Sequence, residues 1–184
     1  IRQLTINNRD KRFNQVLSFV LNKDLSYILT HPEHKIKLSK QISLKYYLYK
    51  LKKGNPIQYI TKEQYFYGLK FKVNKHTLIP RPETEVMVDE VLEEVQSRKY
   101  KVESRIVDIG TGSGAIIISL AKNLKANSCK LEAIDISKKA LKVARQNAKL
   151  NNVAEKIKFL QGNLLEPFIK SYRPTGLPTY NLII

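Results

Sequence analysis

The sequence has little cysteine and no long apolar run, and both absences narrow the classes of protein it can encode. Its 184 residues include one cysteine, Cys129, so an internal disulfide framework is excluded and a reducing compartment is favoured. No stretch approaches the roughly 18 uninterrupted apolar residues of a membrane-spanning helix, and the first thirty residues lack the apolar centre of a signal peptide. We therefore expect a cytoplasmic protein with no membrane partner. The chain begins with Ile1 rather than Met, which suggests an excerpt of a longer protein.

Acidic residues are also scarce, and their scarcity leaves a large positive charge. The chain has 33 Lys and Arg against 16 Asp and Glu, for a formal net charge of +17. Residues 1–60 are the more basic part, with 12 Lys and Arg against 3 acids. A basic surface attracts nucleic acid through phosphate contacts, but the chain has no run of Lys or Arg longer than two. Two interpretations stay open: proximity to RNA or the ribosome through the basic N-terminal region, or lysines that are simply solvated.

The first sixty residues show helical rather than strand periodicity. Residues 13–21 and 42–51 carry apolar side chains at helical spacing, and residues 30–35 between them have the composition of a loop. His31 and His34 in that loop have the spacing of a metal-ligand pair but no companion cysteines or acids. We predict a small helical domain over residues 1–60 and no metal site.

The periodicity then changes twice before residue 100. Apolar and polar residues alternate from Leu69 to Val73 behind Gly68, which predicts a β-hairpin, and we interpret residues 61–80 as a linker between two domains. A helix is predicted from Pro82 to about Arg98, because proline suits a first helical position and an apolar stripe follows it.

From Arg105 onward, strand and helix patterns alternate. Strands are predicted at residues 105–109, 130–136, 156–162 and 180–184, and helices at residues 115–124 and 137–150, the second capped by Ser137. Strands that alternate with helices pair in parallel through right-handed crossovers, so the predicted fold class is α/β with a doubly wound sheet of order 3-2-1-4. The last strand would then be an exposed apolar edge, so we expect more chain after Ile184.

The first strand-to-helix turn carries the strongest functional signal. Gly110, Gly112 and Gly114 stand at every second position of the segment DIGTGSGAI, at the sheet edge where ligands of such folds bind. Missing side chains let a cofactor approach the backbone, and the following helix offers amide donors. A tight turn without a ligand is the alternative explanation of the glycines, so the triplet needs support from its neighbours.

Two acids supply that support. Asp135 ends the second strand, where a carboxylate can accept hydrogen bonds from both hydroxyls of an adenosine ribose, although it could instead only cap the next helix. Asp108 lies in an apolar strand, where its charge is costly unless a positive group faces it. A nicotinamide-binding fold is the main rival, but such sites keep the strand apolar up to the first glycine. Asp108 therefore favours S-adenosylmethionine, which brings an amino group and a sulfonium.

Several stretches resemble the HemK/PrmC family, which methylates the side-chain nitrogen of a glutamine in peptide chain release factors. They are GNPIQYI, FYGLKF, LIPRPETE, RIVDIGTGSGAIIISLA, AIDIS, NA and QGNLLEP, so the likeness runs from about Gly54 to Ile184. The resemblance implies a class I (Rossmann-like) methyltransferase fold in residues 81–184, incomplete at its C-terminal end. It also implies a substrate-recognition role for residues 1–60, and direct displacement on the cofactor's methyl group without a metal or covalent intermediate.

The resemblance also implies roles for individual positions. Gly110, Thr111, Gly112, Ser113 and Gly114 would form the S-adenosylmethionine turn beside Asp108, Asp135 would hold the ribose, and Asn163 and Leu164 would lie beside the adenine. The family often has an acid at the position of Asn163. Arg81, Pro82, Glu83 and Thr84 would border the active site.

The main departure from the family is the missing Asn-Pro-Pro-Tyr segment. In the family this tetrapeptide follows the strand that corresponds to NLII and binds the substrate amide, so we expect it just after Ile184 and expect the 184 residues alone to be inactive. Two alternatives stay open. The same tetrapeptide chemistry would serve amino methylation of a base in RNA or DNA, and a chain without the tetrapeptide could be a non-catalytic binding module.

Overall fold

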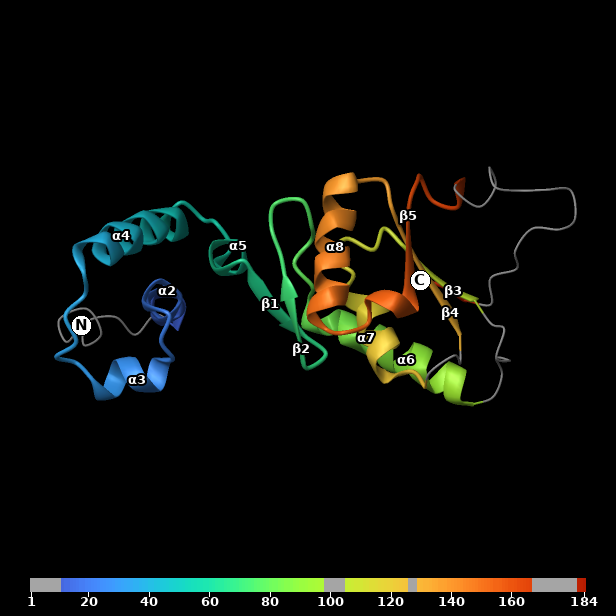
Figure 1. The fold of residues 1–184 in the computed structure, drawn as a ribbon, viewed down its shortest axis with the longest axis horizontal. Coiled ribbons are helices and arrows are strands. Elements are labelled where there is room, and N and C mark those ends of the chain that lie inside the picture. Colours follow the sequence, from blue (N-terminus) through green and yellow to red (C-terminus); the bar gives the residue numbers. More distant parts are fainter. Residues whose placement is uncertain (1–10, 98–104, 126–128, 167–181) are drawn as a thin grey trace, which may run out of the picture. The chain divides into compact units, whose positions relative to one another are not determined.

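The computed structural model describes residues 11–97, 105–125, 129–166 and 182–184 of the chain (Figure 1). These residues divide into two compact units, residues 1–62 and residues 63–184. The segment 61–80, which we expected to be a linker, contributes both strands of its hairpin to the second unit.

The first unit is a small helical bundle with its own core. Helix α2 buries residues at the i, i+3, i+4 and i+7 positions of one face, which is the stripe that the sequence predicted. Asp24 caps the next helix, α3, because its Oδ1 accepts a hydrogen bond of 2.7 Å from the Tyr27 amide. Leu44 of α4 and Ile60 of α5 complete the buried cluster. The helices are α2 (Lys11–Leu21), α3 (Leu25–Thr30), α4 (Leu38–Lys52) and α5 (Ile57–Thr61).

The second unit opens with a short antiparallel hairpin followed by a helix. Strands β1 (Glu63–Phe66) and β2 (Leu69–Lys72) pair around Gly68, whose φ is +69°. The predicted helix at Pro82 begins as a 3-10 turn, η1 (Pro82–Thr84), and continues as α6 (Glu85–Gln96). The Glu85 carboxylate joins this helix to the hairpin, because it accepts a hydrogen bond of 2.8 Å from the Tyr67 amide in the hairpin turn.

A four-stranded parallel sheet forms the centre of the second unit. Its order is β5-β4-β3-β6, with Arg105 of β3 opposite Lys130 of β4 and Leu131 of β4 opposite Ile157 of β5. Counted along the chain this is the 3-2-1-4 order predicted from the sequence. The remaining elements of the unit are β3 (Arg105–Ile109), α7 (Ala115–Asn123), β4 (Lys130–Asp135), α8 (Lys138–Leu150), η2 (Ala154–Lys156), β5 (Ile157–Gln161) and β6 (Leu182–Ile183).

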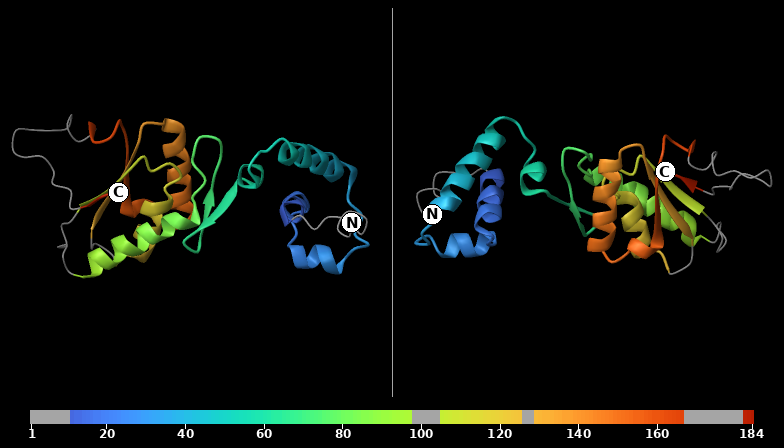
Figure 2. Two further views of the ribbon diagram at one scale, coloured as in Figure 1. Left: turned by 180° about the vertical axis from the view of Figure 1, so that it is seen from behind. Right: turned by 45° about the horizontal axis from the view of Figure 1, so that its top comes forward.

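The main core lies on one face of this sheet. Ile106, Leu131 and Ile157 point to that face, where residues of α6, α7 and α8 pack against them. Figure 2 shows these helices beside the sheet. Val107 and Ile134 belong to a smaller cluster because alternate strand residues point to the opposite face. The sheet thereby fixes which residues of β3 and β4 reach its carboxyl edge, and the candidate site is at that edge.

Candidate cofactor site

The glycine turn joins β3 to α7 in a conformation that side chains resist. Gly110, Gly112 and Gly114 have φ values of +75°, +55° and +80°. The turn is fixed to β4, because the amides of Gly110 and Thr111 both donate to the Ile134 carbonyl, at 2.8 and 2.9 Å. Gly114 also has a packing constraint, since an added Cβ would lie 2.7 Å from Ile118 Cδ1 and 3.2 Å from Ala144 Cβ.

Asp108 is a buried carboxylate directly beneath the turn. Its side chain is 4% exposed, and its Oδ2 accepts a hydrogen bond of 2.7 Å from the Thr111 hydroxyl. Burial raises the pKa of Asp108 to about 6, although the bonds from Thr111 and from the Ile117 amide act in the opposite direction. A positively charged group placed beside Asp108 would therefore stabilise its buried carboxylate.

Asp135 stands at the end of β4 and holds the turn from the other side. Its Oδ2 accepts from the Gly112 amide at 2.9 Å, and its Oδ1 accepts from the Ser137 amide at 2.8 Å. Asp135 thus bonds to two backbone amides, one in the glycine turn and one just before α8. Each of its oxygens still has a lone pair that a ligand hydroxyl could use.

A cavity of about 260 Å³ opens beside the turn. Among the described residues, Arg81 is the one basic residue that lines it and Asp108 the one acid. The remaining lining is mostly apolar or backbone, and comes from β1, the segment before α6, α6 itself, the end of β3, the glycine turn, the start of α7 and the last residue: Phe66, Leu78, Pro80, Thr84, Met87, Ile109, Gly110, Thr111, Gly112, Ser113, Ala115, Ile116 and Ile184.

The other expected site residues do not line this cavity, and Asp135 and Gly114 are among them. Pro82 and Glu83 form the exposed 3-10 turn next to Arg81. Asn163 and Leu164 follow β5, which pairs with β4 up to Asp135 and Gln161, so they lie at the same edge of the sheet as the glycine turn. Leu164 is 64% exposed.

Asn147 is a site residue to which the sequence analysis gave no role. It is fully buried on α8, and its Nδ2 donates to the Ser113 carbonyl in the turn at 2.9 Å. The signal was present in the pattern: Asn147 lies on the inward stripe of α8 between Ala144 and Ala148, where a polar side chain needs buried partners.

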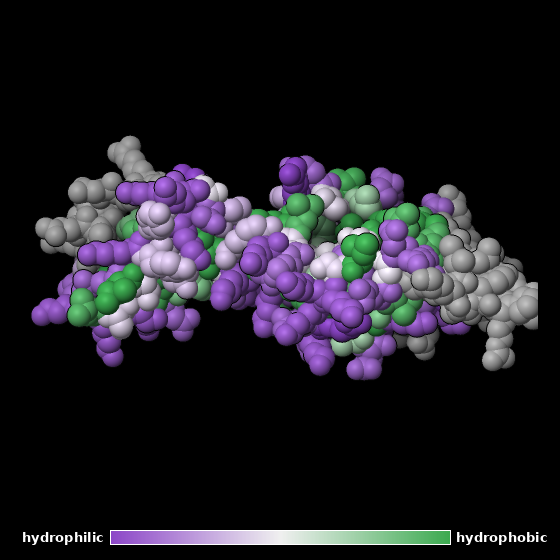
Figure 3. Space-filling model, turned by 90° about the horizontal axis from the view of Figure 1, so that it is seen from above, coloured by the Kyte–Doolittle hydropathy of each residue, from purple (hydrophilic) through white to green (hydrophobic). Residues whose placement is uncertain are grey.

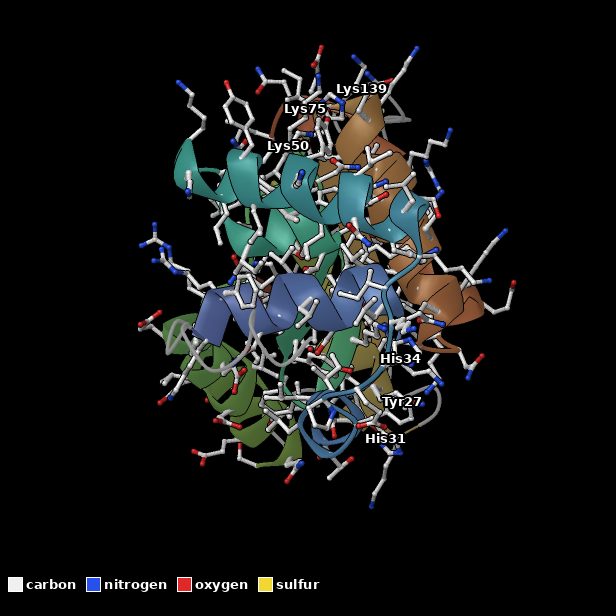
Figure 4. The ribbon with its side chains drawn as sticks, turned by 90° about the vertical axis from the view of Figure 1, so that its left-hand side faces the viewer. Tyr27, His31, His34, Lys50, Lys75 and Lys139 are labelled. Atoms are coloured by element: carbon white, nitrogen blue, oxygen red, sulfur yellow. The ribbon has the colours of Figure 1, made fainter. Side chains whose placement is uncertain are left out.

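The two loop histidines of the first unit form an aromatic group with Tyr27 (Figure 4). The Tyr27 ring stacks on His31 with centroids 4.2 Å apart and meets His34 edge-on at 5.9 Å. Within the described parts of the chain, no three His, Cys, Asp or Glu residues are arranged to hold a metal ion. Nor do the described residues include a helix long and apolar enough to cross a membrane.

Two protein-family models match the chain. Residues 2–61 match the PrmC N-terminal domain, and residues 101–177 match a methyltransferase domain. The chain is therefore similar to the PrmC N-terminal domain in its first part and to methyltransferase domains in its second. The first match falls on the helical unit and the second on the sheet, so the two matched domains correspond to the two units of the structure.

Curated relatives agree with this similarity. The chain is 47% identical over 133 residues to the release factor glutamine methyltransferase of Bacillus subtilis strain 168, covering 71% of this chain and 44% of the relative. It is 39% identical over 177 residues to the protein of that name from Dictyoglomus turgidum, covering 89% and 59%. The chain thus spans about half the length of the curated relatives it matches.

A solved structure shows the same fold. The S-adenosylmethionine-dependent methyltransferase from Agrobacterium tumefaciens aligns with a TM-score of 0.52 and 18% identity, over 66% of this chain and 38% of that one. The α/β class I methyltransferase fold predicted from the sequence is confirmed.

Proposed function

We propose that the protein is an S-adenosylmethionine-dependent methyltransferase that modifies the side-chain amide nitrogen of a glutamine in peptide chain release factors. One observation carries the proposal: the glycine turn, held between two carboxylates, opens onto a cavity in a chain whose first part matches the PrmC N-terminal domain. The names of the relatives supply the substrate class.

The turn has the features that an adenosyl cofactor requires. A Cβ added to Gly110 would meet no atom within 4 Å, so the open space beside this backbone depends on the absence of a side chain. Asp108 faces the same cavity as a buried acid, and the hydrogen bonds that its carboxylate accepts from described residues come from the neutral Thr111 hydroxyl and Ile117 amide. A ligand with a positive group and a shape that fits closely against backbone satisfies both features.

The cofactor, when bound, supplies an activated methyl group on a sulfonium. Different residues of the chain would bind different parts of the cofactor. Asp108 would face the amino group, and Asp135 would accept from the ribose hydroxyls while its bond to Gly112 keeps the turn in place. Asn163 and Leu164, after the neighbouring strand, would border the adenine. Arg81 is the cation of the cavity and is the natural partner for the cofactor's carboxylate.

The acceptor side of the reaction is expected where the last strand ends. An amide nitrogen is a weak nucleophile, so the site must orient it and stabilise its polarised form with fixed acceptors. Ile184 continues the ladder of β3, since its amide donates to the Val107 carbonyl at 2.9 Å, and it lines the cavity. An Asn-Pro-Pro-Tyr segment after Ile184 would therefore enter the site beside the cofactor turn.

The helical unit is proposed to recognise the release factor through α4. Four apolar or aromatic residues on its outer face are more than half exposed: Leu38, Ile42, Tyr46 and Tyr49. Residues 11–62 contain eleven Lys and Arg against two acids, and α4 itself contains no acid. In the view from above, hydrophilic residues surround paler and apolar ones on this unit (Figure 3). Such a face suits a protein surface that is acidic around apolar side chains.

Transfer of a labelled methyl group tests the proposal. The full-length protein is incubated with S-adenosylmethionine labelled in the methyl group and with release factor, total tRNA or DNA. We expect label in wild-type release factor and none in a variant whose acceptor glutamine is replaced by alanine. Label only in nucleic acid would overturn the proposed substrate and favour base methylation. No label with any acceptor, despite cofactor binding, would favour a non-catalytic module.

Two sets of substitutions separate the cofactor side from the substrate side. Arg81→Ala should weaken binding of S-adenosylmethionine about tenfold but leave the affinity for its decarboxylated analogue unchanged, because only the first has a carboxylate. Arg81→Lys serves as the charge-retaining control. An equal loss of affinity for both cofactor forms in Arg81→Ala would refute the role of Arg81.

Tyr49→Ala on α4 should raise KM for release factor and leave the cofactor Kd unchanged.

A further inference from the structure

We infer that Asn147 is a positioning residue that holds the cofactor turn in its binding shape and makes the β1–β2 hairpin part of the cofactor site. The inference rests on the proposed function only in taking S-adenosylmethionine as the ligand of the turn. It assigns a task to a residue that lies outside the cavity and acts through the Ser113 carbonyl.

The side-chain amide of Asn147 makes three hydrogen bonds in the interior, with both of its donors and its oxygen engaged. One Nδ2 hydrogen goes to the Ser113 carbonyl and the other to the Lys72 carbonyl, both at 2.9 Å. Its Oδ1 accepts from the Lys72 amide at 2.7 Å. Asn147 therefore bonds to the edge of β2 in the way a neighbouring strand residue would, and keeps one donor for the turn. No other side-chain type of this size offers two donors and an acceptor in that arrangement.

The turn needs this bond because its other anchors lie on the opposite side. Gly110, Thr111 and Gly112 are all tied to β4, through the Ile134 carbonyl and the Asp135 carboxylate. The Ser113 carbonyl points instead towards α8, and Ser113 is only 3% exposed, so water cannot easily replace a lost partner. A chain segment with three positive φ values is held in one conformation only when it is fixed on both sides.

The hairpin contributes because it immobilises Asn147 itself. Lys72 supplies both backbone groups that orient the amide, and it lies 75 residues earlier in the chain. With these two bonds in place, the remaining Nδ2 hydrogen is directed at Ser113 without further loss of side-chain freedom. A change in the hairpin would thus reach the cofactor turn through one side chain.

The chain offers a matched control one helical turn away. Asn151 is also a buried asparagine and is the C-cap residue directly after α8, and its Nδ2 donates to the Lys70 carbonyl of the same strand at 3.0 Å. Its second bond, also 3.0 Å, goes to the Asn147 carbonyl in the last turn of the helix. Asn151 thus shares the hairpin contact and the residue type with Asn147 and lies at the end of the same helix, but its side-chain hydrogen bonds do not reach the turn.

The experiment compares Asn147→Ala with Asn151→Ala in the full-length protein. Calorimetric titration measures the Kd for S-adenosylmethionine at a temperature well below the Tm of each variant, and hydrogen exchange reports on the amides of residues 110–114. Both variants should lower the Tm. We expect Asn147→Ala to raise the Kd about tenfold and to speed exchange at Gly112 and Gly114. Asn151→Ala should leave the Kd within about twofold of the wild type. The Asn147→Leu variant retains the side-chain volume and gives the same comparison if the alanine variant does not fold.

Each outcome decides between a positioning role and a structural one. If Asn147→Ala lowers the Tm but binds the cofactor like the wild type, Asn147 only supports the fold and the inference is wrong. An equal rise in Kd for both variants would assign the effect to hairpin packing in general and would also overturn it. Failure of the wild-type protein to bind S-adenosylmethionine would refute the proposed function instead, and the exchange at Gly112 and Gly114 would still test the inference.

Discussion

Two alanine substitutions in the glycine turn should separate folding from cofactor binding. Gly110 and Gly114 have nearly the same backbone conformation, with φ values of +75° and +80°, so an alanine is strained to the same extent at both positions. Their surroundings differ. An added Cβ meets nothing within 4 Å at Gly110, which lines the cavity, whereas at Gly114 it would meet Ile118 and Ala144.

The magnitudes follow from these surroundings. A left-handed conformation costs an alanine about 1–2 kcal/mol at either position. At Gly114 there is also overpacking, at about 1–3 kcal/mol. Ile118 Cδ1, at 2.7 Å, is the end of a flexible side chain and can move, but Ala144 Cβ at 3.2 Å is fixed to the helix. The loss of backbone freedom in the unfolded chain cancels between the two variants. We therefore expect Gly114→Ala to be less stable than Gly110→Ala by about 1–3 kcal/mol.

Urea unfolding and calorimetric titration measure the two effects independently. Gly114→Ala should lower the free energy of unfolding by about 2–5 kcal/mol, the sum of the two costs. Gly110→Ala should lose less stability but should weaken binding of S-adenosylmethionine more than tenfold, because its methyl group occupies the space that the ligand needs. Equal stability of the two variants, or a Gly110→Ala protein with undiminished affinity, would refute this reading of the turn.

Three further substitutions test the buried charge of Asp108, its hydrogen bond from Thr111 and the N-cap of α8. The pKa of Asp108 is about 6 in the folded protein and near 3.8 when unfolded, so its buried charge opposes folding increasingly as the pH rises from about 4 to 6. The free energy of unfolding of Asp108→Asn, relative to that of the wild type, should therefore rise by on the order of 2–3 kcal/mol as the pH increases across that interval. The same variant should bind the cofactor more weakly. Thr111→Val removes a bond that lowers this pKa, and should move the pH profile of cofactor binding upward. Ser137→Ala removes the cap of α8, where Ser137 Oγ accepts from the Ala140 amide at 3.2 Å, and should cost about 1 kcal/mol in thermal unfolding with no change in Kd.

The fold was predictable wherever one apolar period runs through a whole element. The strand at residues 105–109 was predicted to the residue, and α8 begins directly after the Ser137 cap, because alternation and capping are local properties of the chain. Helices α3 and α5 were not predicted individually. They are six and five residues long, too short for a helical period to be visible, and the tertiary packing of Ile28 and Ile60 holds them in place.

The site was predictable where function requires an unusual residue in a regular element. Asp108 in an apolar strand and glycines in a turn are visible in the sequence because each is locally unfavourable, and the structure brings them to one cavity with Thr111 and Ser113. What the sequence could not show is which groups hold the turn in shape. Those bonds come from Asp135 and Asn147, which lie 23 and 34 residues along the chain from their partners Gly112 and Ser113.

The bonds that Asp135 and Asn147 make to the turn determine which other residue types could replace each of them. Asp135 contacts the turn through the Gly112 amide, so any acid with the same reach could take its place, whereas Asn147 satisfies three backbone groups at once. Replacement by aspartate would remove both donors and place a carboxylate beside the carbonyls of Lys72 and Ser113 in the interior, which is costly. Replacement by glutamine would lengthen a fully buried side chain and force its neighbours to move. The identity of Asn147 should therefore be more restricted than that of Asp135, although neither side chain lines the cavity.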